Sequence, residues 1–286
     1  MDYELASQRA PLSPPHGKPL IVKLDVNIEH WRFDQPMPRK VIGAPHGREP
    51  DPDVANFSWH EYGNRVGMAR LFDFFEDRGL PVDCLINASV IDTYAPIAER
   101  ALALGWEFVG HGDEQRSIQF EDDPEDVVRR SLARLRAFSG QPVRGWLGCG
   151  LHQTHQTPEH LKSMGVDYVM DWVLDDLPCW MRTAEGPLIA MPYSLELNDA
   201  VVFATERHSG EEIFKRVQST VAVFEAELAR QPRILTLPLH PYLSGVPHRF
   251  HHLCRAIDLL QARDDTVFMN GAAIADWFIG ESPPAA

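Results

Sequence analysis

The sequence predicts an α/β fold, namely a distorted (β/α) barrel of TIM type with about seven strands in a single domain. Short apolar strands alternate with helical segments along the 286 residues, which is typical of a parallel sheet covered by helices. About seven such units in a chain of this length favour a barrel over an open sheet. No Gly-x-Gly-x-x-Gly segment follows any strand, which argues against a dinucleotide-binding fold.

Each element is predicted from the period of its apolar residues and from the residues that flank it. Strands are expected at Pro19–Val26, Val82–Asn87, a segment that ends at His111, Val143–Leu147, Tyr168–Asp171, Pro187–Met191, Arg233–His240 and Thr266–Met269. Acidic residues at a helix start and glycine at its end mark several helix limits. Helices are expected at Glu61–Arg78, Ala95–Leu104, Pro124–Phe138, Pro158–Met164, Gly210–Ala229, Phe250–Arg263 and Ala272–Phe278.

Two segments show little periodicity. Residues 1–18 are polar and contain proline, so we expect a loose N-terminal arm that precedes a barrel of residues 19–286. Residues 32–58 contain five prolines and should form a long loop, a feature that is usually functional or disordered in compact domains.

Composition and charge limit the possible partners and the compartment. A net charge of −14 argues against nucleic acid or an anionic membrane as a partner, because phosphates would be repelled. No apolar run approaches the roughly 20 residues that span a bilayer, and the first residues lack the pattern of a secretory signal. The four cysteines form no Cys-x-x-Cys pair, so a cytoplasmic protein without a disulfide framework is expected.

In barrels of this type the active site lies at the C-terminal ends of the strands. The residues expected there are polar or aromatic: Asp25, Asn27, Glu29, His111, Trp146, Cys149, Asp171, Trp172, Asn198 and His240. Histidine is suited to proton transfer or metal binding near neutral pH. Because His111 and His240 both end apolar strands, we expect one site that the fold assembles from distant segments.

Seven short motifs occur in order and together span roughly residues 20–280. They are Val26–Glu29, Trp59–Arg65, Gly105–Gly112, Arg144–Gly148, Asp171–Trp180, Asn198–Asp199 and Leu239–Pro247. In this order they resemble the polysaccharide deacetylase family, and within it the branch of metal-independent allantoinases and cyclic imide hydrolases. The resemblance implies hydrolysis of a carbon–nitrogen amide bond in a distorted (β/α) barrel.

The resemblance also raises the question of a metal. Family members usually bind a divalent metal through an Asp and two His that are four residues apart. Here the residue four positions after His111 is Gln115, a poor ligand for zinc, and Asp25 is not followed by a second Asp. The first motif of the metal-independent branch has Asn and Glu two apart, as Asn27 and Glu29 are. We therefore expect no cofactor, and keep a divalent metal such as zinc as the minority alternative.

Roles follow from chemistry and from the resemblance. His111 and His240 are expected to share proton transfer, one accepting a proton from water and the other donating one to the leaving nitrogen. Glu29 is either the base or the group that orients an imidazole, and Asp25 is either catalytic or a cap of the following turn. The expected substrate-binding residues are Asn27, Glu61, Arg65, Trp146, Cys149, Asp171, Trp172, Trp180 and Asn198.

Some of these residues also have a purely structural interpretation. Glu61 and Arg65 lie four apart on a predicted helix and could form an ion pair. Backbone amides around Cys149 could bind an oxyanion, whereas the resemblance does not support a covalent role for its thiol. Three further histidines do not have the spacing of a helical zinc motif and are interpreted as solvated or substrate-facing: His152, His155 and His160.

The sequence thus predicts a hydrolase of a small cyclic amide, imide or ureide that acts without nucleic acid or membrane partners. Two alternatives stay open: a metal-dependent N-deacetylase of an acetylated sugar, and a catalytically inactive barrel that binds a ligand. We also expect a homo-oligomer, in which the arm and the long loop could cover a neighbour's pocket.

Overall fold

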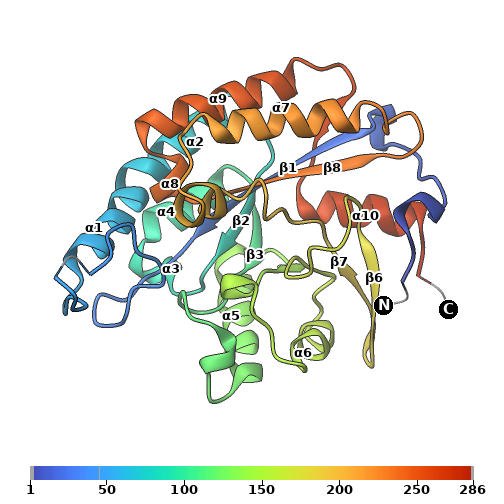
Figure 1. The fold of residues 1–286 in the computed structure, drawn as a ribbon. Coiled ribbons are helices and arrows are strands. Elements are labelled where there is room, and N and C mark those ends of the chain that lie inside the picture. The colour runs from blue at the N-terminus through green and yellow to red at the C-terminus, as the bar shows by residue number, and fades with distance from the viewer. Residues whose placement is uncertain (1–2, 45, 285–286) are drawn as a thin grey trace.

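The computed structural model describes residues 3–44 and 46–284 (Figure 1). The two ends of the predicted domains, residues 1–2 and 285–286, and residue 45 of the predicted loop lie outside the described residues. The strands are β1 Leu20–Ile28, β2 Asp83–Ile86, β3 Glu107–Gly110, β4 Gly145–Trp146, β5 Tyr168–Val169, β6 Cys179–Thr183, β7 Gly186–Ala190, β8 Arg233–Leu239 and β9 Thr266–Phe268.

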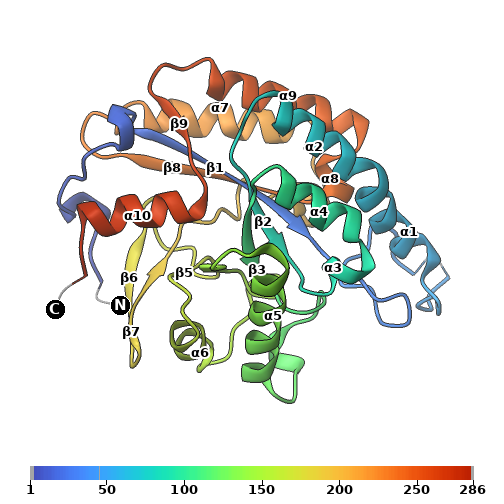
Figure 2. The same cartoon turned by 180° about the vertical axis from the view of Figure 1, so that it is seen from behind.

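In the described part of the chain these nine strands form one sheet of order β6-β7-β5-β4-β3-β2-β1-β8, and β9 pairs with β1. The ladders are parallel except the one between β6 and β7. The sheet curls into a half-barrel with helices along its outer face (Figures 1 and 2). This is the predicted distorted (β/α) barrel. Strand β6 was not predicted, because it is a short, partly exposed edge strand without an apolar run.

The α-helices are α1 Val54–Tyr62, α2 Met68–Asp77, α3 Val90–Thr93, α4 Ala95–Ala103, α5 Pro124–Ser139, α6 Thr157–Ser163, α7 Glu212–Phe224, α8 Pro241–Ser244, α9 Pro247–Gln261 and α10 Gly271–Glu281. Short 3₁₀ turns lie at Ala6–Gln8, Pro15–Gly17, Ile118–Phe120 and Cys149–Leu151, and π-helical turns at Gly63–Gly67 and Ala200–Thr205. Among the described residues no helix is long and apolar enough to cross a bilayer.

The predicted boundary between the long loop and the helix that follows it was wrong. The helix predicted from Glu61 begins seven residues earlier, at Val54, because the Asp53 side chain accepts a hydrogen bond from the Asn56 backbone and caps it. The long loop therefore ends at Asp53. The arm is also not loose over its described residues, since Arg9 forms an ion pair with Asp175 at 2.9 Å.

Side chains of β1 alternate between two environments, as a strand requires. One set packs under the outer helices in the largest core: Leu20, Val22, Leu24, Val26 and Ile28. The other set belongs to the interior of the half-barrel, where Ile21 joins a smaller core with residues of α10. The next inward residues are polar and buried: Lys23, Asp25, Asn27 and Glu29. The interior therefore changes from apolar to charged toward the C-terminal ends of the strands.

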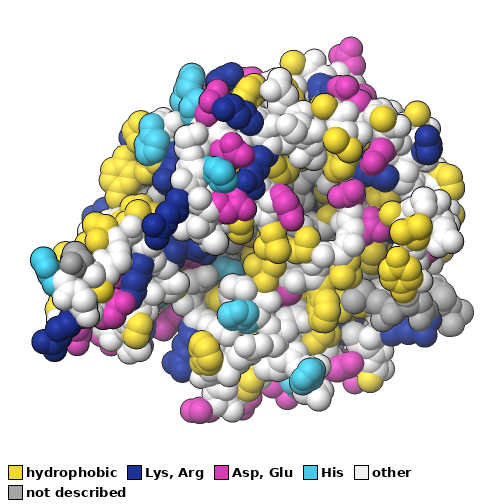
Figure 3. Space-filling view, viewed as in Figure 1, with side chains coloured by type: hydrophobic (Ala, Val, Ile, Leu, Met, Phe, Trp, Pro, Cys, Tyr) yellow, Lys and Arg dark blue, Asp and Glu magenta, His cyan; other side chains and the backbone are white. Residues whose placement is uncertain are grey.

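The π-helical turn between α1 and α2 packs directly on α8, the segment that follows β8. A Cβ atom at Gly63 would overlap the backbone of Tyr242, and one at Gly67 would overlap the Pro241 carbonyl. Glycine is required here for close approach of two backbones. This contact fixes the path of the chain immediately after His240. On the face shown in Figure 3, acidic, basic and hydrophobic side chains are intermixed.

Candidate active site

His240 follows β8 at the C-terminal edge of the sheet and is held by Asp199. The Asp199 carboxylate accepts hydrogen bonds from the His240 backbone amide at 2.7 Å, from His240 Nδ1 at 2.6 Å and from Ser244 Oγ at 2.7 Å. All of these atoms are buried. Because a carboxylate only accepts, Nδ1 carries a proton and the ring orientation is fixed.

Glu29, at the end of β1, faces the other ring nitrogen of His240. Its Oε1 lies 3.5 Å from His240 Nε2, and its Oε2 accepts hydrogen bonds from Trp31 Nε1 at 2.7 Å and Tyr242 Oη at 3.3 Å. Burial opposes the charge of His240, but Asp199 and Glu29 outweigh it and raise its pKa to about 9. Burial likewise opposes the charge of Glu29, but His240 lowers its pKa to about 2. The pair is an imidazolium and a carboxylate at neutral pH.

His111 follows β3 and differs from His240 in its protonation. Its Nδ1 lies 2.7 Å from the Leu147 carbonyl oxygen, which can only accept, so Nδ1 carries the proton. Its Nε2 is buried without a hydrogen-bond partner and keeps a free lone pair. Burial lowers the pKa of His111, with smaller opposing effects from Glu29 and the Leu147 carbonyl. The ring is therefore a neutral base with a free Nε2. The charge of Glu29 acts on this ring, so the two groups lie near each other.

Gly110, the residue before His111, lets the Trp146 ring pack closely on the backbone of β3. A Cβ atom at this position would lie 2.6 Å from the ring and 3.2 Å from Leu132 of α5. Trp146 is thus buried under the outer helices rather than in the barrel interior.

Two residues of the site were missed in the sequence. His60 lies within α1, stacks on Trp31 at 4.3 Å between ring centroids, and has no hydrogen-bond partner on either ring nitrogen. Burial lowers its pKa to about 4, and the Glu29 carboxylate opposes this. His60 belongs to the Trp59–Arg65 motif, but it does not end a strand. Asp199 is adjacent to the predicted Asn198, and its role depends on a contact with His240 that the sequence does not reveal.

Asp25 lies one layer below the histidines. Its carboxylate is paired with the Lys23 ammonium, which also lies 3.1 Å from Asp83 Oδ2. All three side chains are fully buried. Burial raises the pKa of Asp25 to about 8, against the effect of Lys23. Between this layer and Glu29 lies Asn27, whose Nδ2 donates to the Leu239 carbonyl at 3.2 Å.

Cys149 contacts the backbone of His111 and not its ring. Its thiol donates to the His111 carbonyl at 3.1 Å, and burial raises its pKa to about 12. The thiol is therefore protonated and not a nucleophile at neutral pH. Asn87 Nδ2 donates to the same carbonyl and lies 3.4 Å from Gln115 Oε1.

The other predicted residues are spread around the site. Glu61 and Arg65 form the i,i+4 ion pair at 3.2 Å, and Glu61 also accepts from the Tyr94 hydroxyl. Asp171 binds the loop after β4, since its Oδ1 accepts from the Gly148 amide at 2.6 Å. Burial raises the pKa of Asp171 to about 7. Asn198 Oδ1 accepts from the Ala200 amide at 2.9 Å.

The three predicted tryptophans do not form a common pocket wall. Trp146 is buried as described, whereas Trp172 is exposed and donates to Gln153 Oε1 at 2.9 Å. Trp180 donates to the Ser282 carbonyl at 2.8 Å and packs on Phe278, next to the C-terminal helix. The predictions for these tryptophans rested on position along the chain, which does not specify the side of the sheet that each ring faces.

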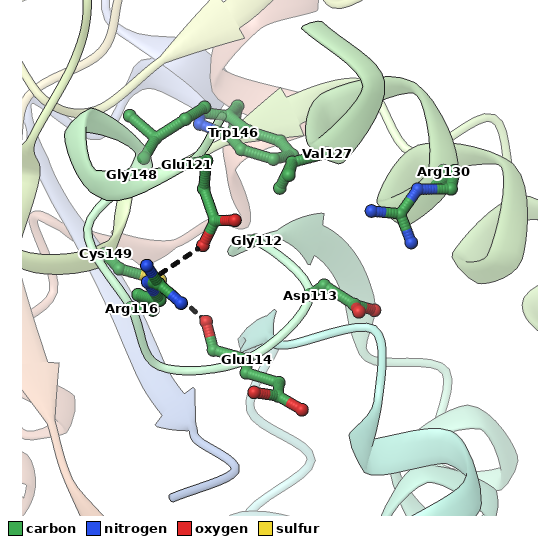
Figure 4. Close-up of a pocket in the computed structure, with 11 residues that line it drawn as sticks. Gly112, Asp113, Glu114, Arg116, Glu121, Val127, Arg130, Trp146, Gly148 and Cys149 are labelled. Carbon is green, nitrogen blue, oxygen red and sulfur yellow. Dashed lines mark hydrogen bonds and ion pairs between the residues drawn. The ribbon is translucent and has the colours of Figure 1, made fainter. Parts of the chain in front are cut away.

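A cavity of about 170 Å³ opens next to the residue that follows His111 (Figure 4). It is lined by Gly112, Asp113, Glu114, Arg116, Ile118, Glu121, Val127, Arg130, Trp146, Gly148 and Cys149. Within this cavity Arg116 Nε lies 3.3 Å from Glu121 Oε1, and the Arg116 backbone amide donates to the Glu114 carbonyl at 2.7 Å (Figure 4). A larger cavity of about 630 Å³ lies between the N-terminal arm, the segments that follow β5 and β7, α7 and β8. Neither cavity is lined by His240 or Glu29.

The side chains do not fit the divalent metal that the family resemblance implies. Among residues 3–44 and 46–284, no group of three His, Cys, Asp or Glu side chains is arranged to hold a metal ion. Gln115 faces Asn87, and the nearest interior aspartate, Asp25, already binds the Lys23 ammonium. A second cation beside that ammonium would be repelled.

The fold and the site together define a curled (β/α) barrel with a cluster of buried imidazoles and carboxylates at the C-terminal edge of its sheet.

Comparisons with known proteins agree with this class. No protein-family model matches the chain. A protein of Schizosaccharomyces pombe named "Putative polysaccharide deacetylase" is 22% identical over 247 residues, which are 79% of this chain and 77% of that protein. The crystal structure of a "probable Polysaccharide deacetylase" from Pseudomonas aeruginosa PAO1 is similar with a TM-score of 0.85 and 25% identity, over 96% of both chains. That of Puue allantoinase is similar with a TM-score of 0.84 and 22% identity, over 100% of both chains. The resemblance to the family and the fold class predicted from the motifs are confirmed.

Proposed function

We propose that the protein is a hydrolase that cleaves a non-peptide carbon–nitrogen bond in a small cyclic amide, imide or ureide, by acid–base catalysis with its own side chains. The names of the similar proteins support the reaction class, since deacetylation of an amide and opening of allantoin both hydrolyse such a bond. A small substrate is favoured by burial, because His111, Glu29 and His240 are only 2%, 3% and 4% exposed.

One observation carries the mechanism: His240 lies between two buried carboxylates, which raise its pKa to about 9, whereas His111 Nε2 is buried without a hydrogen-bond partner. In the proposed reaction a water oxygen attacks the carbonyl carbon and its proton passes to His111 Nε2. The carbon–nitrogen bond then breaks, and the leaving nitrogen takes a proton from His240. Proton exchange with solvent restores both rings.

Glu29 has a positioning role in this scheme. Its pKa of about 2 is too low for an effective general base at neutral pH, since a base works best with a pKa near the working pH. Its carboxylate instead keeps His240 protonated and orients it together with Trp31 and Tyr242. This assigns Glu29 the second of its two predicted roles. Asp25 has no step here, because it binds Lys23.

The test is a substrate panel assayed with the full-length protein before and after chelation, with metal content measured in both samples. The panel contains a hydantoin, a succinimide, allantoin and an N-acetylated sugar oligomer. We expect turnover of a cyclic compound that survives metal removal, and a loss of ~10²-fold or more in His111→Gln and in His240→Asn.

Two outcomes would contradict the proposal. Turnover of only the acetylated sugar, lost with zinc on chelation, would identify a metal-dependent deacetylase. Binding of panel compounds without turnover of any of them would identify an inactive ligand-binding barrel.

A further inference from the structure

The loop between β1 and α1 carries a cation that the described chain leaves without an ionic partner. Arg39 is half-buried, and its Nε is buried without a hydrogen-bond partner. Over residues 3–44 and 46–284, no carboxylate oxygen lies within ion-pair distance of its guanidinium, although the chain contains 41 acidic and 27 basic residues. By contrast, Arg32 and Lys40 on the same loop pair with Asp34 and Glu49.

The loop holds Arg39 in place from both sides. Two residues before it, Met37 is buried in a cluster with Trp31 and Tyr242. After it, the side chain of buried Asn56 accepts from the Val41 and Ile42 amides at 2.8 and 3.0 Å and donates to the Ile42 carbonyl at 2.9 Å. The backbone on both sides of Arg39 is therefore held in place.

Arg39 also lies at the edge of the active site. Its guanidinium is within hydrogen-bonding reach of the Tyr242 side chain, and the charges of Glu29 and Asp199 act on it. The Tyr242 hydroxyl in turn donates to Glu29 at 3.3 Å. The Tyr242 hydroxyl therefore lies between Arg39, which comes from the loop, and Glu29, which follows β1.

The charges around this hydroxyl indicate which ligand would complete the site. The carboxylates of Glu29 and Asp199 are already matched by hydrogen bonds to His240, Ser244, Trp31 and Tyr242. The planar Arg39 guanidinium, a group that suits a carboxylate with two parallel hydrogen bonds, has a buried Nε–H without a hydrogen-bond partner. A neutral carbonyl could accept from that donor, but only a carboxylate also matches the charge and the two-donor geometry of the guanidinium.

We propose that Arg39 is the substrate-binding residue that receives an anionic substituent, so that the preferred substrate is a cyclic amide, imide or ureide that carries a carboxylate. This inference rests on the proposed function for the chemistry at the ring, and it adds the charge of the substrate and the residue that selects it.

The test compares two probes of nearly equal shape, hydantoin-5-acetate and the neutral hydantoin-5-acetamide. Binding is measured by titration calorimetry in a His111→Gln background, which lacks the proposed base, so that affinity is separated from turnover. The variants are Arg39→Gln, Arg39→Lys and, as a control that removes a positive charge from the neighbouring, already paired position, Lys40→Gln.

We expect the acid to bind about 10- to 100-fold more tightly than the amide when Arg39 is present, the range that a charge-assisted hydrogen bond gives. The ratio should be kept in Lys40→Gln, fall to about 1 in Arg39→Gln, and be restored in part in Arg39→Lys. Equal binding of the two probes to the protein with Arg39, an unchanged ratio in Arg39→Gln, or binding of neither probe would overturn the inference. If the ratio behaves as expected but the protein with His111 hydrolyses neither probe, the proposed function fails while the assignment of Arg39 stands.

Discussion

His240 Nε2 lies 3.5 Å from Glu29 Oε1, while the Nδ1 of the same ring is bound by Asp199 at 2.6 Å. An imidazole between two buried carboxylates behaves differently from an isolated histidine. Its proton is retained well above neutral pH, so the ring can serve as a general acid where a solvent-exposed histidine would already be neutral.

The first prediction concerns the pH profile. Because the pKa of His240 is raised to about 9, the acid form is present below that value and is lost as the pH rises through it. We expect kcat/KM to fall on the alkaline side near pH 9. In Glu29→Gln, which removes one of the two carboxylates, maximal activity should be lower and the alkaline fall should begin at a lower pH. An alkaline limb at the same pH in both proteins would contradict this assignment of the acid.

The second prediction concerns stability. Replacing one partner of a buried, hydrogen-bonded charge pair typically costs roughly 3–5 kcal/mol, so Asp199→Asn should lower the free energy of unfolding by about that amount at pH 7. A raised histidine pKa stabilises the folded state fully below the unfolded pKa of about 6.5, and this contribution is lost as the pH rises through the folded value of about 9. The difference between wild type and Asp199→Asn in urea unfolding should therefore shrink between pH 7 and pH 10. A difference that is independent of pH would show that the ionic contact is not its source.

The third prediction concerns the thiol behind His111. With a pKa raised to about 12 by burial, Cys149 should resist iodoacetamide at pH 8 in the folded protein and react only after unfolding. Peptide mass spectrometry of native and denatured samples measures this. The half-buried Cys254 serves as the internal comparison. Rapid alkylation of Cys149 in the native protein would show that the thiol is accessible, contrary to its hydrogen bond with the His111 carbonyl.

The fourth prediction concerns the contact between the helix turn and α8. Gly63→Ala places a methyl group onto the backbone of Tyr242, and overpacking of this kind costs about 1–3 kcal/mol. Activity should fall as well, because Tyr242 follows His240 by two residues and donates to Glu29. Gly43→Ala is the matched control, since no atom lies within 4 Å of its added Cβ. Equal unfolding midpoints for the two variants would contradict the close contact.

The sequence was sufficient for those parts of the molecule that depend on local pattern. The runs of apolar residues located β1, β3 and β8, and the expected positions of His111, His240 and Glu29 just after these strands agree with the structure. It was insufficient where a tertiary contact decides. The depth of Asp25 depends on Lys23, which lies two residues before it on the same face of β1, and nothing in the apolar pattern distinguishes a catalytic aspartate from one that binds a neighbouring lysine.

The same limit applies to His60 and Asp199. A helical histidine normally packs or hydrogen-bonds in a core, and only the stacking on Trp31 reveals that His60 borders the site. Asp199 becomes informative only when the chain brings it against a ring 41 residues later. The predicted tryptophans separate in the structure, since Trp146 lines the cavity of about 170 Å³, whereas Trp180 packs on Phe278 next to the C-terminal helix.

The Lys23 ammonium, which lies between Asp25 and Asp83 beneath the reaction centre, has a practical consequence. It is a positive charge that the polypeptide itself supplies, so it cannot dissociate, exchange or be taken up by a chelator. At this depth of the barrel the positive charge is therefore fixed by the sequence itself.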